Sequence, residues 1–253
     1  MKIIIKYILL ILISFLFVSC AKTPYTKRSQ FIMMDVNQEM RLGLQEAKKI
    51  LKSEKISRDR RKTAMVKRVG KKIAKVSAQN NFKWEFFLID KDILNAFCLP
   101  GGKVFVYKGI FKAVKNEDQL AVVMGHEIAH ALARHGAERM SMVQLSNIGK
   151  NILTKTLGGS KYANIANIAY GMTQNYGLVL PYSRKFEYEA DEIGLYLMTK
   201  AGYNPKEAIK FWQNMRKLKN GNNPPTFLST HPADYNRIKK LKKLIPKALK
   251  YYK

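Results

Sequence analysis

The chain has 253 residues, which is long enough for one well-packed domain with short appendages at its ends. Hydrophobic residues make up 47% and charged residues 25%, which excludes an intrinsically disordered, collagen-like or mucin-like chain. The formal net charge of +28 would attract nucleic acid, anionic lipid or acidic polymers, and the charge alone does not distinguish among these partners.

The first twenty residues have the layout of a secretory signal. Lys2 and Lys6 precede an apolar run from Tyr7 to Phe17, which is too short to span a bilayer comfortably and is closed by residues 18–20. The segment around Cys20 is similar to the lipobox of bacterial lipoproteins, which implies that this cysteine carries acyl chains. We therefore expect a signal peptide over residues 1–19 and an exported protein. Lipidated Cys20 would anchor it to the outer membrane, facing the periplasm, with the inner membrane as the alternative.

The remaining composition narrows the class of partner. Cys98 is the only other cysteine, so no internal disulfide is available to the exported chain. Basic residues are scattered along the sequence, and no nucleic-acid module is recognisable, so we expect a solvated basic surface near anionic lipid and no nucleic-acid partner. No further run of ~20 apolar residues follows residue 20, which disfavours an intramembrane enzyme.

The N-terminal half predicts helices around a pair of strands. A tether over Ala21–Arg28 is followed by a helix over Val36–Leu51, with Asp35 as its N-cap, and by a second helix over Arg58–Ser77. Two runs of strand-forming residues follow, and we expect these strands to pair. They are Trp84–Ile89 and Val104–Tyr107.

The C-terminal half predicts a largely helical arrangement. Asn116 caps a long buried helix that continues to about Met140. The charge-poor stretch between Gly158 and Leu180 is expected to be a mobile amphipathic lid. Further helices are predicted over Ser183–Gly202, after a capping box at residues 204–207, and in the basic C-terminal segment.

His126, Glu127 and His130 form an HExxH sequence in the middle of the predicted long helix. Residues four apart share a helix face, so both imidazoles can bind one Zn²⁺. Glu127 is rotated by about 100° from His126 and can reach a metal-bound water. Histidines satisfied within a core are the alternative, which the rarity of this spacing disfavours. An open tetrahedral site needs one more protein ligand.

The residues directly after the HExxH sequence do not supply that ligand. Metzincins place a third histidine six positions after the second, and this chain has Gly136 there. His135 would lie about 140° around a continuous helix from His130, so we expect it to serve packing or a surface hydrogen bond.

A later helix offers a carboxylate ligand. Glu187 and Asp191 are four residues apart and share a helix face, whereas Glu189 points away from Glu187. We therefore expect Glu187 to be the third ligand. Asp191 would accept a hydrogen bond from a ligating histidine and fix its tautomer.

Together these residues resemble the gluzincin metallopeptidases of peptidase family forty-eight, and in particular their periplasmic lipoprotein peptidases. The resemblance also covers Asn95–Gly102, which is similar to the family segment NAFALPGG, and it includes His231 and Arg237. It implies an α+β fold, a mostly helical single zincin-like domain with a small β-sheet beside the active-site helix.

The resemblance further implies one Zn²⁺ per chain, bound by His126, His130 and Glu187, with Glu127 as the general base. Asp191 would support His126.

Two roles remain open for His231. The resemblance implies that it approaches the zinc, either as a displaceable fourth ligand that silences the enzyme or as a stabiliser of the oxyanion. The donor to the oxyanion would be His231, Arg237 or a tyrosine such as Tyr182, and the sequence does not decide among them.

The expected reaction is peptide hydrolysis. Zinc polarises the scissile carbonyl, while Glu127 takes a proton from the zinc-bound water and delivers it to the leaving amine. Asn95, Ala96 and Phe97, together with the strand Val104–Tyr107, are expected to bind an extended substrate at a sheet edge. We expect a zinc endopeptidase that cleaves unfolded or misassembled envelope proteins. The alternative is a zinc-stabilised chaperone or assembly factor at the outer membrane with latent proteolysis.

The expected organisation has three segments: a signal peptide over residues 1–19, a lipid-anchored tether with an N-terminal helix over residues 20–55, and the catalytic domain over residues 56–253. The expected partners are protein or peptide substrates and the membrane reached through Cys20. The sequence leaves the oligomeric state open.

Overall fold

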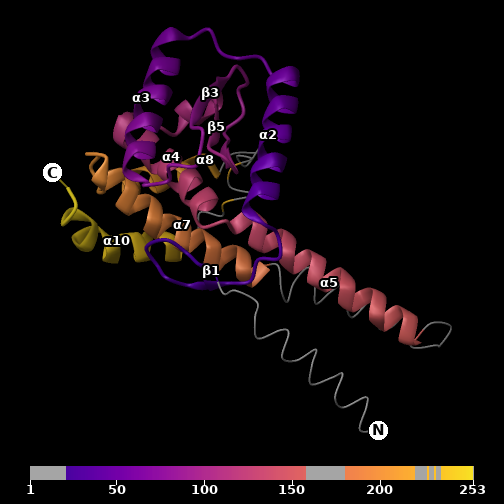
Figure 1. Cartoon of the computed structure of the whole chain (residues 1–253). Helices are drawn as coiled ribbons and strands as arrows, with labels where there is room; N and C mark the ends of the chain where they lie inside the picture. The colour runs from indigo at the N-terminus through magenta and orange to yellow at the C-terminus, as the bar shows by residue number, and fades with distance from the viewer. Residues whose placement is uncertain (1–20, 158–179, 220–226, 228–230, 232–234, 253) are drawn as a thin grey trace.

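The computed structural model describes residues 21–157, 180–219, 227, 231 and 235–252. The predicted signal peptide and the lipidation site at Cys20 lie outside these residues, as does nearly all of the predicted lid. In the described part, helices surround a small three-stranded sheet (Figure 1), which confirms the expected α+β, zincin-like fold.

The sheet has the strand order β3-β5-β4. Strand β3 (Glu85–Ile89) pairs in parallel with β5 (Lys103–Tyr107), which confirms the predicted pairing of these two runs. Strand β4 (Ala96–Leu99) pairs antiparallel with the other side of β5. Every residue of β5 is buried, as its continuous apolar run requires of a central strand.

This order separates the two segments expected to bind substrate. Residues 104–107 belong to the central strand, whose two sides are already paired, so the expectation that they add a substrate strand is wrong. Ala96 and Phe97 belong to β4, which lies at an edge of the sheet and beside the helix that carries the HExxH sequence.

Two N-terminal helices begin at aspartate caps. The Asp35 carboxylate accepts hydrogen bonds from the first turn of α2 (Val36–Ser53), and Asp59 does the same for α3 (Arg60–Val76). Helix α3 packs on the sheet through Gly70, where a Cβ atom would overlap the ring of Phe86.

The central helix α4 (Glu117–Leu132) is buried on nearly all sides. The Asn116 side chain caps it by accepting a hydrogen bond from the Gln119 amide, as predicted. The helix ends eight residues before the predicted end near Met140, because Arg134 takes a left-handed conformation with a φ of 52°.

Helix α5 (His135–Leu157) begins directly after this break and projects away from the body of the molecule (Figure 1). A short 3₁₀ helix, η1 (Lys108–Lys112), connects β5 to the segment before α4.

Two further helices pack on α4, and a third packs on those two. Helix α7 (Leu180–Lys200) crosses α4 and confirms the helix predicted over Ser183–Gly202, apart from its exact ends. Helix α8 (Glu207–Lys219) follows a tight turn, and the basic helix α10 (Tyr235–Leu249) packs on α7 and α8, as expected for the C-terminal segment.

The expected tether is a packed hairpin. Strands β1 (Ala21–Lys22) and β2 (Ser29–Gln30) pair antiparallel, and the side chains of Thr23 and Gln30 are almost fully buried. The side-chain Nε2 of Gln30 donates to the Ala133 carbonyl at the α4–α5 break. This hairpin therefore packs against the part of the fold that holds the HExxH sequence.

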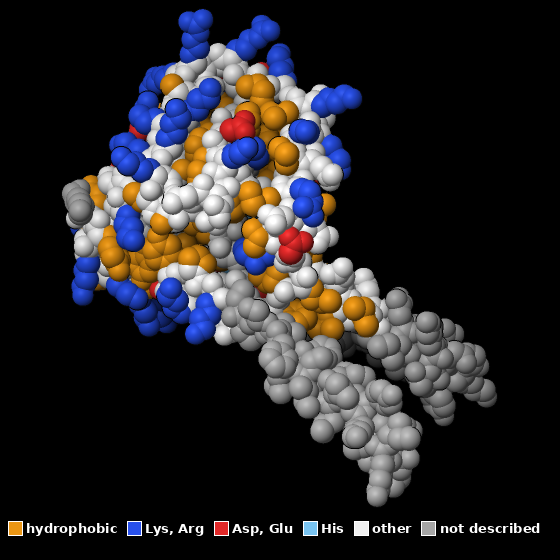
Figure 2. All heavy atoms as spheres, viewed as in Figure 1, with side chains coloured by type: hydrophobic (Ala, Val, Ile, Leu, Met, Phe, Trp, Pro, Cys, Tyr) orange, Lys and Arg blue, Asp and Glu red, His pale blue; other side chains and the backbone are white. Residues whose placement is uncertain are grey.

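Lys and Arg side chains are spread over the visible face, with hydrophobic areas between them (Figure 2). This distribution agrees with the scattered basic residues of the sequence. Among the helices that the structure describes, none combines the length and apolar character needed to span a bilayer.

Candidate metal centre

Four side chains meet where α4 faces α7 and the segment before α10. His126 and His130 come from consecutive turns of α4, Glu187 comes from α7, and His231 comes from the loop before α10. One ligand atom from each residue lies within 4.8 Å of the others. The structure thus brings together the three predicted ligands and the additional histidine.

The distances between these atoms match a tetrahedral site. His126 Nε2 lies 3.1 Å from His130 Nε2 and 3.2 Å from Glu187 Oε2. His130 Nε2 lies 3.4 Å from Glu187 Oε1. Ligand atoms placed tetrahedrally at zinc distances are about 3.3 Å apart. The imidazole nitrogens and the carboxylate therefore have both the chemistry and the spacing that zinc requires.

The carboxylate of Glu187 is charged at neutral pH. Burial opposes its ionisation, but hydrogen bonds from His126 and His130 dominate and lower its pKa. An ionised carboxylate is the form that binds a cation.

Glu127 lies beside the ligand atoms without joining them. Its side chain is buried, and its Oε1 atom has no hydrogen-bond partner among the residues that the structure describes. The Oε1 atom lies 3.6 Å from His231 Nε2. Burial raises the pKa of Glu127, so this carboxylate is a stronger base than a solvated glutamate.

Asp191 lies behind His126, as expected. Its Oδ1 atom is 3.1 Å from His126 Nδ1, on the side of the ring opposite the ligand atoms. Arg237 donates to both oxygens of Asp191, at 2.7 Å from Nε and 2.6 Å from Nη2. Burial opposes the ionisation of Asp191, yet Arg237 and His126 lower its pKa.

Arg237, which the sequence offered as a donor to the oxyanion, lies behind the ligands. The side chain is 1% exposed, its Nη1 atom lies 3.1 Å from Glu187 Oε2, and its guanidinium stacks 3.8 Å from the centre of the Trp212 ring. The guanidinium therefore faces the two carboxylates and fixes their positions. The side chain of Tyr182, the other donor considered, lies outside the described side chains.

His231 is held by two contacts along the chain. Its amide donates to the Phe227 carbonyl at 2.8 Å, and its ring stacks on the Phe227 ring with centroids 4.5 Å apart. The amide of Phe227 in turn donates to the carbonyl of Leu94, next to Asn95. These contacts place His231 Nδ1 3.0 Å from Glu187 Oε2 and 3.2 Å from His126 Nε2.

The segment predicted to bind substrate lies alongside. The Asn95 side chain accepts a hydrogen bond from the Ala96 amide, and the Asn95 carbonyl accepts one from the Tyr107 amide. Ala96 is buried, and the Phe97 ring stacks on Phe105. The polar groups of Asn95 therefore hold the start of β4 in place.

Sequence reasoning missed the surroundings of His130. The Nδ1 atoms of His130 and His135 lie 2.9 Å apart, and His135 Nε2 lies 3.1 Å from Glu189 Oε2. Burial lowers the pKa of both histidines, which keeps them neutral. His135 stays outside the ligand atoms and packs on Phe186, as expected. Its contact with His130 was not expected, because a continuous helix would have placed His135 elsewhere and the helix breaks at Arg134.

Comparison with known proteins places this geometry in a family. Residues 60–245 match the description Peptidase family M48. The chain belongs to peptidase family M48. It therefore contains a metallopeptidase domain of this family, whose cofactor is zinc.

Several M48 relatives are metalloendopeptidases. Mitochondrial metalloendopeptidase OMA1 of Schizosaccharomyces pombe is 39% identical over 187 residues, which cover 74% of this chain and 54% of the relative. Human mitochondrial metalloendopeptidase OMA1 is 33% identical over 255 residues, which cover 95% of this chain and 49% of the relative. The beta-barrel assembly-enhancing protease of Escherichia coli is 29% identical over 215 residues, which cover 81% of this chain and 43% of the relative. The M48 chain spans about half the length of these relatives.

These relatives correct one expectation. The predicted location at the outer membrane, facing the periplasm, is wrong on this comparison, because the yeast and human relatives are mitochondrial proteins. That prediction rested on the first twenty residues alone. The matches include mitochondrial enzymes and a bacterial protease, so they establish the M48 family and not the expected lipoprotein subgroup.

Proposed function

We propose that this chain is an endopeptidase that hydrolyses peptide bonds in extended segments of unfolded or misassembled proteins. His126, His130 and Glu187 would hold the zinc, and Glu127 would act as the general base. The observation that carries this proposal is the separation of 3.1 to 3.4 Å between the three ligands, with a carboxylate oxygen of Glu127 beside them that has no hydrogen-bond partner among the described residues.

When bound, zinc supplies Lewis acidity, which polarises the scissile carbonyl and makes a water molecule a better nucleophile. The Glu127 carboxylate would accept a proton from the attacking water and deliver it to the leaving amine; its Oε1 atom has no hydrogen-bond partner within the described part of the chain. The raised pKa of Glu127 suits both steps, because the group must take up a proton and then release it.

The residues behind the ligands fix their geometry. Asp191 accepts the Nδ1 hydrogen of His126, which leaves the Nε2 lone pair directed at the other ligand atoms. Arg237 holds Asp191 and Glu187 together, so the carboxylate from α7 keeps its place relative to the histidines of α4.

We assign His231 to the role of a displaceable fourth ligand. Its Nδ1 atom lies as close to Glu187 and His126 as the other ligand atoms do. Four protein ligands make a closed tetrahedral site, whereas a catalytic site keeps one position for water or substrate. The resting enzyme would therefore be latent until His231 moves aside.

The edge strand β4 supports an extended substrate. A peptide in β conformation can pair with the free side of this strand, next to α4 and the ligand atoms. Such binding requires a segment that is not already folded. The name of the Escherichia coli relative, a beta-barrel assembly-enhancing protease, supports misassembled proteins as the substrate class.

The test is cleavage of an unfolded casein by the purified full chain, with and without a chelator. We expect cleavage that a chelator abolishes and that zinc restores. The Glu127→Gln variant should bind zinc and cleave nothing, while the control Glu46→Gln, at an exposed position on α2, should cleave normally.

Cleavage that persists in chelator would overturn the proposed chemistry, and full activity of Glu127→Gln would overturn the role of Glu127. The chaperone alternative would gain support if Glu127→Gln still suppressed aggregation of an unfolded protein as well as the wild type does.

A further inference from the structure

The chain has four histidines, and His135 is the one that stands outside the group of ligand atoms. Its side chain is 2% exposed and stacks on the Phe186 ring with centroids 4.4 Å apart. Its two ring nitrogens contact His130 and Glu189, at 2.9 Å and 3.1 Å. A histidine that served packing alone would not need a polar partner on both nitrogens.

We propose that His135 and Glu189 are positioning residues that hold His130 in the tautomer and orientation needed to bind the metal. This inference rests on the proposed function, because it takes His130 as a ligand.

The hydrogen bonds of Glu189 determine which ring nitrogen of His135 and of His130 carries a hydrogen. A carboxylate that accepts hydrogen bonds from Thr26 and Arg28 is an acceptor, so the Nε2 atom of its partner His135 carries a hydrogen. Nδ1 of the neutral His135 is then an acceptor. The facing Nδ1 of His130, 2.9 Å away, therefore carries the other hydrogen. This leaves the Nε2 lone pair of His130 pointing at the ligand atoms.

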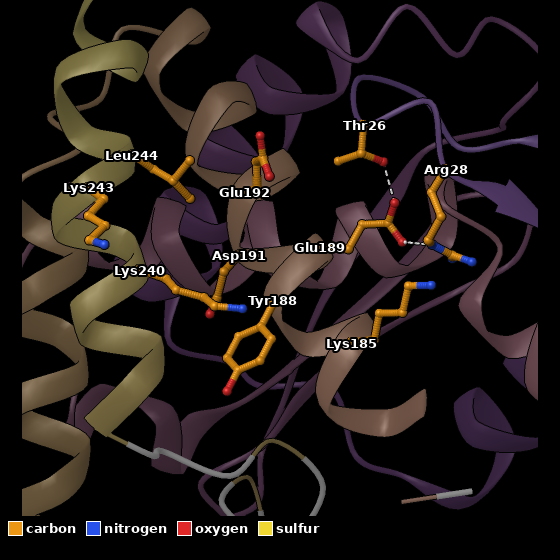
Figure 3. A pocket seen from close by; sticks show the side chains of 10 residues that line it. All are labelled: Thr26, Arg28, Lys185, Tyr188, Glu189, Asp191, Glu192, Lys240, Lys243 and Leu244. Carbon is orange, nitrogen blue, oxygen red and sulfur yellow. Dashed lines mark hydrogen bonds and ion pairs between the residues drawn. The ribbon is translucent and has the colours of Figure 1, made fainter. Parts of the chain in front are cut away.

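The orientation of Glu189 is fixed from the N-terminal hairpin. Arg28 Nε donates to Glu189 Oε2 at 2.7 Å, and the Thr26 hydroxyl donates to Oε1. Figure 3 shows Glu189 reaching from α7 to both residues, at the wall of a cavity of about 420 Å³. The terminal nitrogens of Arg28 are held in turn by Glu138, at 2.8 and 2.7 Å. The carboxylate therefore cannot rotate away without breaking these bonds.

The two ligating histidines of α4 are supported in different ways. His126 contacts its carboxylate, Asp191, directly. His130 reaches its carboxylate, Glu189, only through the His135 ring. A hydrogen-bonded carboxylate raises the basicity of a ligating imidazole, and its loss typically weakens metal binding. The His135 ring thus connects His130 to the carboxylate of Glu189, which is too far away to contact His130 directly.

The experiment is a measurement of the zinc dissociation constant by competition with a chromophoric chelator, on full-length variants. His135→Leu keeps the apolar contact with Phe186 and removes both hydrogen bonds, so we expect zinc binding to weaken by about 10- to 100-fold. His135→Asn should lose less, because its amide oxygen can accept the His130 Nδ1 hydrogen. Glu189→Gln should weaken zinc binding because it removes the negative charge that accepts the Nε2 hydrogen of His135.

Glu46→Gln is the matched control, because it also replaces a glutamate with its amide. Glu46 is exposed on α2 and pairs with Lys49, so its substitution should leave the zinc dissociation constant unchanged. The absorption spectrum of the Co²⁺-substituted protein gives a second readout, which should change for His135→Leu and stay the same for Glu46→Gln.

Failure of the wild type to bind zinc would refute the proposed function. Normal zinc binding by the wild type, with an unchanged dissociation constant in folded His135→Leu and Glu189→Gln, would refute this inference alone. If His135→Leu does not fold, Glu189→Gln decides by the same criterion.

Discussion

Gly125 of α4 and Gly194 of α7 face each other where the two helices cross. A Cβ atom on Gly125 would lie 2.9 Å from the Gly194 carbonyl oxygen, and one on Gly194 would lie 2.8 Å from the His126 amide nitrogen. Because both residues are glycines, the two helix backbones come into contact next to His126. This close approach brings Glu187, two turns earlier on α7, within reach of the histidines.

Gly194→Ala should therefore separate the two helices. We expect a loss of about 1–3 kcal/mol in the free energy of unfolding, since the added carbon meets backbone and no flexible side chain. Zinc binding should weaken as well. Urea unfolding with and without zinc measures both effects. Gly136→Ala is the control, because no atom of the described residues lies within 4 Å of its added carbon, and equal effects of the two substitutions would contradict this account.

Arg237→Met should be strongly destabilising. It leaves the buried carboxylates of Asp191 and Glu187 without their shared cation, and breaking a buried ion pair costs about 3–5 kcal/mol. Denaturant unfolding in chelator measures this loss without a contribution from zinc. The control is Lys239→Met on the exposed side of the same helix, and a similar small loss for both variants would show that Arg237 is dispensable.

Zinc should stabilise the protein through the ligand residues only. At a free zinc concentration of 100 times the dissociation constant, mass action predicts about 2.7 kcal/mol of added stability. Thermal unfolding should show this gain for the wild type and for Glu127→Gln, whose substituted side chain is not a ligand. His126→Ala should lose it, and an undiminished gain in that variant would place the metal elsewhere.

Acid should remove the contribution of Glu189 to stability. Burial opposes its ionisation, but hydrogen bonds from His135, Thr26 and Arg28 dominate and lower its pKa to about 2. A lowered folded-state pKa stabilises the protein above the ordinary pKa near 4.5, and that stability is lost as the pH falls toward 2. The difference in unfolding free energy between wild type and Glu189→Gln, measured in chelator, should be constant at neutral pH and shrink below about pH 4.5. A difference independent of pH down to 2 would be inconsistent with this shift.

Much of the site follows from periodicity in the sequence. Helical spacing places His126 and His130 on one face, and the same rule pairs Glu187 with Asp191 on a second helix. The structure shows each pair with its side chains directed at the other. The caps at Asp35 and Asn116 were also predictable, since each side chain satisfies free amides of the first helical turn.

The support of His130 was not predictable in this way. Ala133 and Arg134 are good helix formers, so local helix propensity does not predict that α4 ends there. Tertiary contacts hold the break: Arg134 donates to Glu39 at 2.7 Å and to the Met34 carbonyl at 3.0 Å. Such contacts join residues about one hundred positions apart, which single-sequence periodicity does not reveal.

The packing of the N-terminal hairpin was missed for a similar reason. Its Thr, Pro and Lys residues have the composition of a linker, and its strands are only two residues long. Its place in the fold comes from Arg28, which binds Glu138 and Glu189 on two different helices. A single arginine in a polar segment does not indicate from the sequence that it will pair with carboxylates on two helices.

The left-handed residue Arg134 has a mechanical consequence. Helix α5 has 23 residues, so it forms an arm about 34 Å long whose base is His135. The arm leaves the body of the molecule while its first residue touches a ligand of the proposed metal centre (Figure 1). A rotation of α5 about Arg134 would therefore displace His135, and with it the hydrogen-bond partner of His130.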